Sequence, residues 1–143
     1  MLVSSLLAGC ADGGTAPPDP AARQALARFD GLYQGQQLPS GAVGNCRAQP
    51  RTVWFRVRDG VVELRSSRRR HSSTQRPIMA GRVRADGELA MNRDGSDRFA
   101  AGRIEGNRLA VTELPPSIGP LAGGSTCLYR YEAERQQGDE EAE

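Results

Sequence analysis

The stretch FRVRDGVVEL, residues 55–64, has the pattern of a β-hairpin. Its first half alternates apolar and basic side chains, the chain then reaches Asp59-Gly60, and the second half returns through apolar residues. Asp-Gly between two such runs is a strong signal for a two-residue hairpin turn. Period-2 alternation predicts one apolar face and one mostly basic face, which Trp54 interrupts, so Trp54 is expected at a rim or under a loop.

The same design recurs in GRVRADGELAM (81–91) and GRIEGNRLAV (102–111). The spacing of the three units is irregular, which indicates separate hairpins rather than a solenoid. Asp94-Gly95 supplies one more turn signal. Together these patterns predict strands over residues 30–36, 51–58, 61–66, 79–85, 88–93, 98–105, 108–114 and 126–134.

Eight strands without a helical crossover form an antiparallel meander. Such a meander removes its exposed edges when the first and last strands pair, so we predict an all-β fold, a small closed barrel rather than a sandwich. The interior of a small barrel is filled by side chains or holds one small ligand. We expect large inward side chains from Phe55, Leu89, Met91 and Phe99. For Tyr33, Tyr129 and Tyr131 we expect core packing, with stacking on a ligand as the alternative.

A short helix is predicted before the first strand, in AARQALARF (21–29). Asp19 suits the capping position and Pro20 the first helical position. Leu26 and Phe29 are expected to touch the barrel.

The chain opens with MLVSSLLAGC, a short apolar run that ends at Cys10. About eight apolar residues are too few to span a bilayer and suit the end of a signal peptide. Leu7-Ala8-Gly9-Cys10 resembles a bacterial lipobox, although no basic residue precedes the apolar run. The resemblance implies that Cys10 receives a diacylglyceryl group, becomes the first residue after cleavage and anchors the chain in a membrane through its acyl chains. The alternative is an ordinary cysteine in a disordered segment.

This resemblance sets the expected organisation of the chain. Residues 1–9 are the end of a signal peptide, 10–22 a lipidated cysteine with a Gly/Pro-rich tether, 23–135 the barrel, and 136–143 an acidic disordered tail. The expected location is the bacterial cell envelope. Ala11 after the cysteine is similar to the pattern of outer-membrane lipoproteins that face the periplasm.

If Cys10 is lipidated, Cys46 and Cys127 remain as an even pair. Export to an oxidising compartment then predicts a Cys46–Cys127 disulfide. Cys46 follows the first strand and Cys127 lies in the last, so the bond would join the closure seam. Two free buried thiols are the alternative.

The sequence shows no motif for catalysis or metal binding, and we expect no enzyme activity, cofactor or metal. His71 is the only histidine and lies in a predicted loop, where a catalytic set lacks a rigid scaffold. All nineteen basic residues are Arg, and the net charge is +2. Without an aromatic–basic motif this does not predict nucleic-acid binding. A monomer is expected.

Two connections are the candidate binding features. RSSRRRHSSTQR (65–76) contains no acid, and its guanidinium groups suit phosphates and carboxylates. We therefore predict an anion-binding loop of Arg65, Arg68, Arg69, Arg70 and Arg76, with a solvated hairpin loop as the alternative. ELPPSIGPLAGGS (113–125) is long enough to be functional. It predicts a partner- or ligand-binding loop of Leu114, Ile118 and Leu121, with a plug over the barrel end as the alternative.

Three functions follow. The first is a non-catalytic envelope lipoprotein that binds a protein or an anionic envelope polymer through its loops. The second is an inhibitor of a hydrolase by loop insertion, because the architecture is similar to that of small disulfide-linked envelope barrels that include lipoprotein inhibitors of lysozyme and of proteases. The third is a carrier of a small apolar ligand in the barrel.

Overall fold

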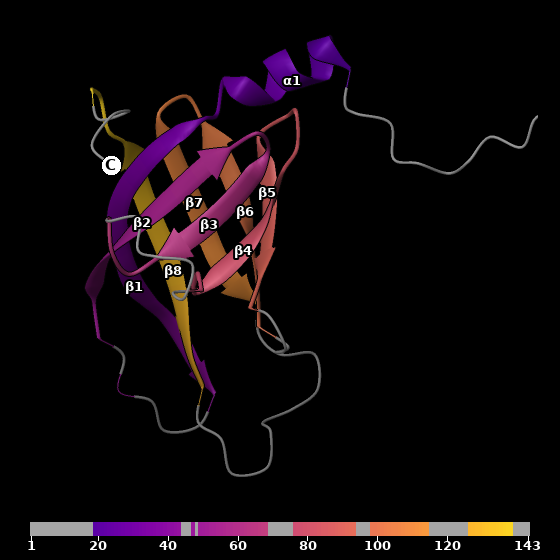
Figure 1. The fold of residues 1–143 in the computed structure, drawn as a ribbon. Coiled ribbons are helices and arrows are strands. Elements are labelled where there is room, and N and C mark those ends of the chain that lie inside the picture. The colour runs from indigo at the N-terminus through magenta and orange to yellow at the C-terminus, as the bar shows by residue number, and fades with distance from the viewer. Residues whose placement is uncertain are drawn as a thin grey trace, which may run out of the picture.

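The structure is a computed structural model that describes residues 19–43, 47, 49–68, 76–93, 98–114 and 126–138. One helix, α1 (Pro20–Ala27), is followed by eight strands in a closed barrel in which each strand pairs with its sequence neighbours and β1 also pairs with β8 (Figure 1). All pairs are antiparallel. The strands are β1 (Gly31–Val43), β2 (Arg51–Arg58), β3 (Val61–Arg65), β4 (Met79–Val83), β5 (Glu88–Asn92), β6 (Phe99–Glu105), β7 (Arg108–Leu114) and β8 (Thr126–Arg135). The predicted all-β barrel is confirmed.

Strand β1 extends seven residues beyond its predicted end. The pairing with β2 stops at Gln37, whereas the pairing with β8 continues to Val43 across an irregularity between Pro39 and Gly41. Pro39 has no N–H to donate and therefore suggests a strand end in sequence. At a bulge on a singly paired extension a proline is tolerated.

The short turns form as their sequences predict. Asp59 and Gly60 have φ angles of 50° and 77°, which suit the left-handed turn that joins β2 to β3. Asp94-Gly95 lies outside the described residues.

The barrel interior is packed with side chains. The largest fully buried ones are Tyr33, Tyr131, Phe55, Leu64, Ile104, Leu109, Val53 and Val62. Leu89 and Met91 also point inward, as predicted. The prediction for Phe99 is wrong, because its side chain is 51% exposed. Ala100 and Ile104 are buried on the same strand, and period-2 alternation then places Phe99 outside.

Helix α1 lies over one end of the barrel (Figure 1). Asp19 caps it by accepting from the Ala21 amide at 2.9 Å. Phe29 is 5% exposed and closes this end, and the Arg135 guanidinium donates to the Tyr33 hydroxyl at 2.7 Å and to the Arg28 carbonyl at 2.7 Å. Leu26 lies close to Gly60. The predicted contacts of the helix are therefore confirmed.

Candidate functional site at the loop end of the barrel

The short connections between strands lie at one end of the barrel, and the long connections belong to the other end. In an antiparallel meander, alternate connections fall at opposite ends. The short turns after β2, β4 and β6 lie with α1, at what we call the helix end (Figure 1). The four long connections, 44–50, 66–78, 93–98 and 115–125, all belong to the opposite end, the loop end. The topology therefore brings both predicted binding connections to one end.

A buried carboxylate lies inside the barrel toward the loop end. The Glu113 side chain is 3% exposed, and its Oε2 lies 2.6 Å from the Arg98 guanidinium. The Tyr131 hydroxyl donates to Glu113 Oε1 at 2.8 Å, and the Tyr129 amide donates to Oε2 at 3.3 Å. Arg98 also donates to the Cys127 carbonyl at 3.1 Å. This buried network ties β7 and β8 to the segment that enters β6.

The network stabilises the neutral form of a tyrosine. Burial first, and then the negative charge of Glu113, raise the pKa of Tyr131 above its ordinary value of 10. At the helix end, burial raises the pKa of Tyr33 against the opposing effect of Arg135. Both rings therefore remain protonated in the folded barrel at pH values where an unfolded tyrosine loses its proton.

The free energy of unfolding is expected to fall as the pH rises above about 10. Below the pKa of a tyrosine in the unfolded chain, Tyr33 and Tyr131 are protonated in both states, so their raised pKa values do not change stability. Above that pKa, the unfolded chain releases these protons while the folded barrel keeps them, and this favours unfolding. The urea midpoint should therefore drop between about pH 9 and pH 11. Tyr131→Phe should make this drop smaller, and an equal drop in the variant would contradict the prediction.

The arginines of the predicted anion-binding loop differ in their surroundings. Arg65 is the last residue of β3, and its Nε and Nη2 donate to Glu63 Oε2 at 3.0 and 2.8 Å. Arg68 and Arg76 are exposed at the two ends of the connection between β3 and β4. Arg69 and Arg70 lie outside the described residues, so the predicted cluster stays a prediction.

The predicted partner-binding loop is described only at its start. Leu114 is the last residue of β7 and 49% exposed on the outer surface, directly opposite the exposed Phe99 of β6. Ile118 and Leu121 lie outside the described residues. Leu114 and Phe99 thus form an exposed apolar pair where β7 ends, next to this connection.

The cysteine predictions rest on residues that the structure does not describe. Cys127 lies in β8 opposite Ala42, and it is the only cysteine within the described ranges. Cys10 and Cys46 lie outside them. Lipidation and the disulfide therefore remain predictions.

Sequence reasoning missed the Glu113–Arg98 pair. Glu113 follows Val111 on the inward side of β7, so strict alternation places a carboxylate in the core. That signal is visible in RLAVTEL once Leu109 and Val111 are taken as inward positions. The sequence does not show that Arg98 is the partner of Glu113, because the two residues are fifteen positions apart in the chain.

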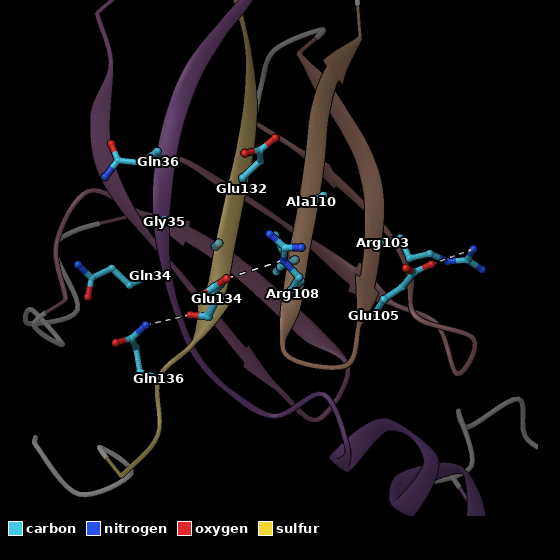
Figure 2. A pocket seen from close by; sticks show the side chains of 12 residues that line it. Gln34, Gly35, Gln36, Arg103, Glu105, Arg108, Ala110, Glu132, Glu134 and Gln136 are labelled. Carbon is cyan, nitrogen blue, oxygen red and sulfur yellow. Dashed lines mark hydrogen bonds and ion pairs between the residues drawn. The ribbon is translucent and has the colours of Figure 1, made fainter.

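A groove of about 900 Å³ lies on the outer wall over β6, β7, β8 and β1 (Figure 2). Arg103 lies 3.6 Å from Glu105, and Arg108 lies 3.8 Å from Glu134. The lining holds two arginines against three glutamates. These local pairs leave the groove without a net attraction for anions, and we assign no ligand to it.

Within the described ranges, no cluster of histidine, cysteine, aspartate and glutamate is suited to holding a metal ion. In the same part of the chain, no helix has the length and apolar character needed to cross a membrane. Comparison with known proteins finds no matching family model, no matching curated protein and no matching solved structure.

Proposed function

We propose that this chain is a non-catalytic lipoprotein of the bacterial cell envelope, anchored through Cys10, whose barrel binds an anionic envelope polymer or a protein through its loop end. The observation that carries the proposal is the separation of the two ends. The chain enters the barrel through α1 at the helix end, whereas the four long connections belong to the loop end (Figure 1). Seven-residue strands tilted in a barrel separate the ends by roughly 20 Å. A tethered barrel can thus present its loops away from the anchor.

The filled interior supports a role outside the barrel. Tyr33, Phe55 and Tyr131 have no exposed surface above 2% and occupy the space that a carried ligand needs. The carrier alternative therefore has no support from the described core. The Glu113 carboxylate is held by Arg98, the Tyr131 hydroxyl and the Tyr129 amide, which supports a structural rather than a catalytic role for it.

We propose that Cys46 and Cys127 form a disulfide at the closure seam. Cys127 lies opposite Ala42, and Cys46 follows Ala42 by only four positions along the chain. A bond there would join the two strands whose pairing closes the barrel. A thiol titration of the unfolded but unreduced chain should find no free thiol at either position.

Replacing Cys10 with serine is expected to release the protein from membranes. Serine cannot receive the diacylglyceryl group, and stable anchoring requires acyl chains. The test expresses the chain with a complete signal peptide in a bacterium and measures membrane and soluble fractions. Cys127→Ser is the matched control and should stay in the membrane fraction. Equal membrane association of Cys10→Ser and the natural chain would overturn the anchor.

Inhibition of a hydrolase is the second candidate, favoured by the exposed Leu114–Phe99 pair beside the 115–125 connection. Replacement of this connection by a Gly-Ser segment should abolish inhibition of lysozyme or a protease if the loop inserts into an active site. Unchanged inhibition would exclude that mode.

A further inference from the structure

The eight strands distribute their charges unequally around the barrel. Strands β2, β3 and β4, the near wall in Figure 1, carry five arginines and one glutamate, a net charge of +4. The other five strands carry four arginines and five glutamates, a net charge of −1. We call the outer surface of β2, β3 and β4 the basic wall. Arg51 is in phase with the inward residues of β2, so the wall itself carries Arg56, Arg58, Arg65, Arg82 and Glu63, a net charge of +3. The 66–78 connection, with Arg68, Arg69, Arg70 and Arg76, joins two of its strands.

The single acid of these strands neutralises only one arginine. Glu63 is held by Arg65 through two guanidinium donors. Among the described residues, Arg56 and Arg82 make no hydrogen bond or ion pair through their side chains. Arg58 lies 3.9 Å from Asp59, with both side chains largely exposed, so that pair is weak. Arg56 and Arg82 thus make no ion pair with a described carboxylate, although Arg56 stands directly opposite Glu63 in register.

The register places these cations within reach of one ligand. Arg58 lies opposite Val61, which lies opposite Arg82, so the two arginines stand two strand spacings apart, about 10 Å. Arg56 lies two residues before Arg58 on the same face, about 7 Å away along β2. A polymer with repeated anionic groups suits this spacing better than a single small anion.

An unusual tryptophan lies in the same wall. Trp54 stands between Gln34 of β1 and Arg65 of β3 in direct register. Its Nε1–H is buried and has no acceptor within the part of the chain that the structure describes. A buried donor without an acceptor costs free energy, which a hydrogen bond to a ligand oxygen would recover. Indole beside amide and guanidinium groups offers an apolar platform and donors to a sugar ring.

A hollow of about 580 Å³ continues the wall past β4. It is lined by Arg76, Pro77, Ile78, Met79, Ala80, Asn92 and Arg93, without an acid among these described residues. The Arg93 guanidinium donates to the Ile78 carbonyl at 3.4 Å, which holds it at this site.

We propose that the basic wall, with Trp54 on its β2 strand, binds an acidic polysaccharide, a polymer of sugar rings that carry anionic groups. The proposal rests on the proposed function, of which it names the surface and the class of polymer. The net charge of +3 supplies the attraction, with Arg56 and Arg82 free of ion pairs to described residues, and Trp54 with Gln34 supplies the contact to sugar.

The test uses the full chain in mild detergent, with the fluorescence of Trp54, the only tryptophan, as the readout. Dextran sulfate should bind and change the emission of Trp54. Uncharged dextran should not bind detectably, and polyglutamate, an anion without sugar, should bind at least about tenfold more weakly. Binding of dextran sulfate should weaken steeply with added salt.

Matched variants locate the site. Arg56→Gln with Arg82→Gln should weaken dextran sulfate binding about tenfold or more. Arg103→Gln with Arg108→Gln removes the same charge from the opposite wall and should change binding less than about threefold. Equal losses in the two pairs would show an effect of net charge alone and overturn the basic wall as the site.

Other outcomes separate this inference from the proposed function. Equal binding of polyglutamate and dextran sulfate would overturn the assignment to a polysaccharide. Loss of binding only when 66–77 is replaced by Gly-Ser, with the wall variants unaffected, would overturn the wall and leave a loop-end site standing. No binding of dextran sulfate at low salt would overturn the inference, whereas the Cys10→Ser test of the anchor would be unaffected.

Discussion

Gly102→Ala is expected to prevent folding of the barrel or to destabilise it by about 3 kcal/mol. A Cβ built at Gly102 would lie 1.9 Å from the Ala110 carbonyl oxygen and 2.7 Å from the Val111 Cα. The obstacle is the backbone of β7, which pairs with β6 at this point, so no rotamer change relieves the contact. For a domain of about 110 residues, the loss corresponds to a fall in melting temperature of roughly 10–20 °C.

Gly41→Ala is the matched control for this effect. It also places a methyl group on a barrel strand, yet the nearest atom is Leu128 Cδ1 at 3.7 Å, an ordinary contact. Its melting temperature should lie within a few degrees of the natural chain. Thermal unfolding followed by circular dichroism compares the two variants, and similar melting temperatures would contradict the close approach at Gly102.

Glycines at the bends of the barrel are partly visible in the sequence. The units GRVRADGELAM and GRIEGNRLAV begin at Gly81 and Gly102, two residues before the buried Val83 and Ile104. Both glycines face inward and oppose a neighbouring strand closely. In the first unit, Phe55 occupies the equivalent position and is fully buried. The repeat therefore has a large core side chain at this position in the first unit and a glycine in the other two, where the backbone of a neighbouring strand approaches closely.

The hairpins were predictable because their signals are local. Asp59-Gly60 adopts the positive φ angles that its residue types favour, and alternation assigns β2 and β7 without reference to the rest of the chain. Pairing across the seam is not local. The extension of β1 past Gln37 is set by β8, about ninety residues away, and its own sequence, with Pro39, argues against a strand.

The candidate site was predictable in its location more than in its contacts. Topology alone brings the 66–78 and 115–125 connections to one end once the meander is accepted. Sequence could not show that Arg65 pairs with Glu63, or that Arg56 and Arg82 have no such partner. Charge in a sequence gives the number of cations but not their partners. Register places Arg56 opposite Glu63, yet the carboxylate pairs with Arg65, two residues away on its own strand.

Replacing Glu113 with alanine is expected to lower the free energy of unfolding by about 2–3 kcal/mol. The change leaves the Tyr131 hydroxyl and the Tyr129 amide without their acceptor, and it removes the carboxylate that holds Arg98. The range for fully buried pairs is larger, but Arg98 is 29% exposed, so water compensates part of its charge. Urea unfolding at neutral pH measures the difference.

Glu132→Ala is the matched control. Glu132 is exposed on β8, so this substitution removes the same charge without taking away a buried hydrogen-bond acceptor. It should change stability by less than about 0.5 kcal/mol. Arg98→Ala with Glu113→Ala should lose less than the sum of the two single changes, since each single change strands the other group. Additive losses would show that the two side chains act independently and that the 2.6 Å contact does not stabilise the barrel. A loss shared between them would instead show that one buried charge pair joins β7 to the residue that enters β6 and stabilises the barrel there.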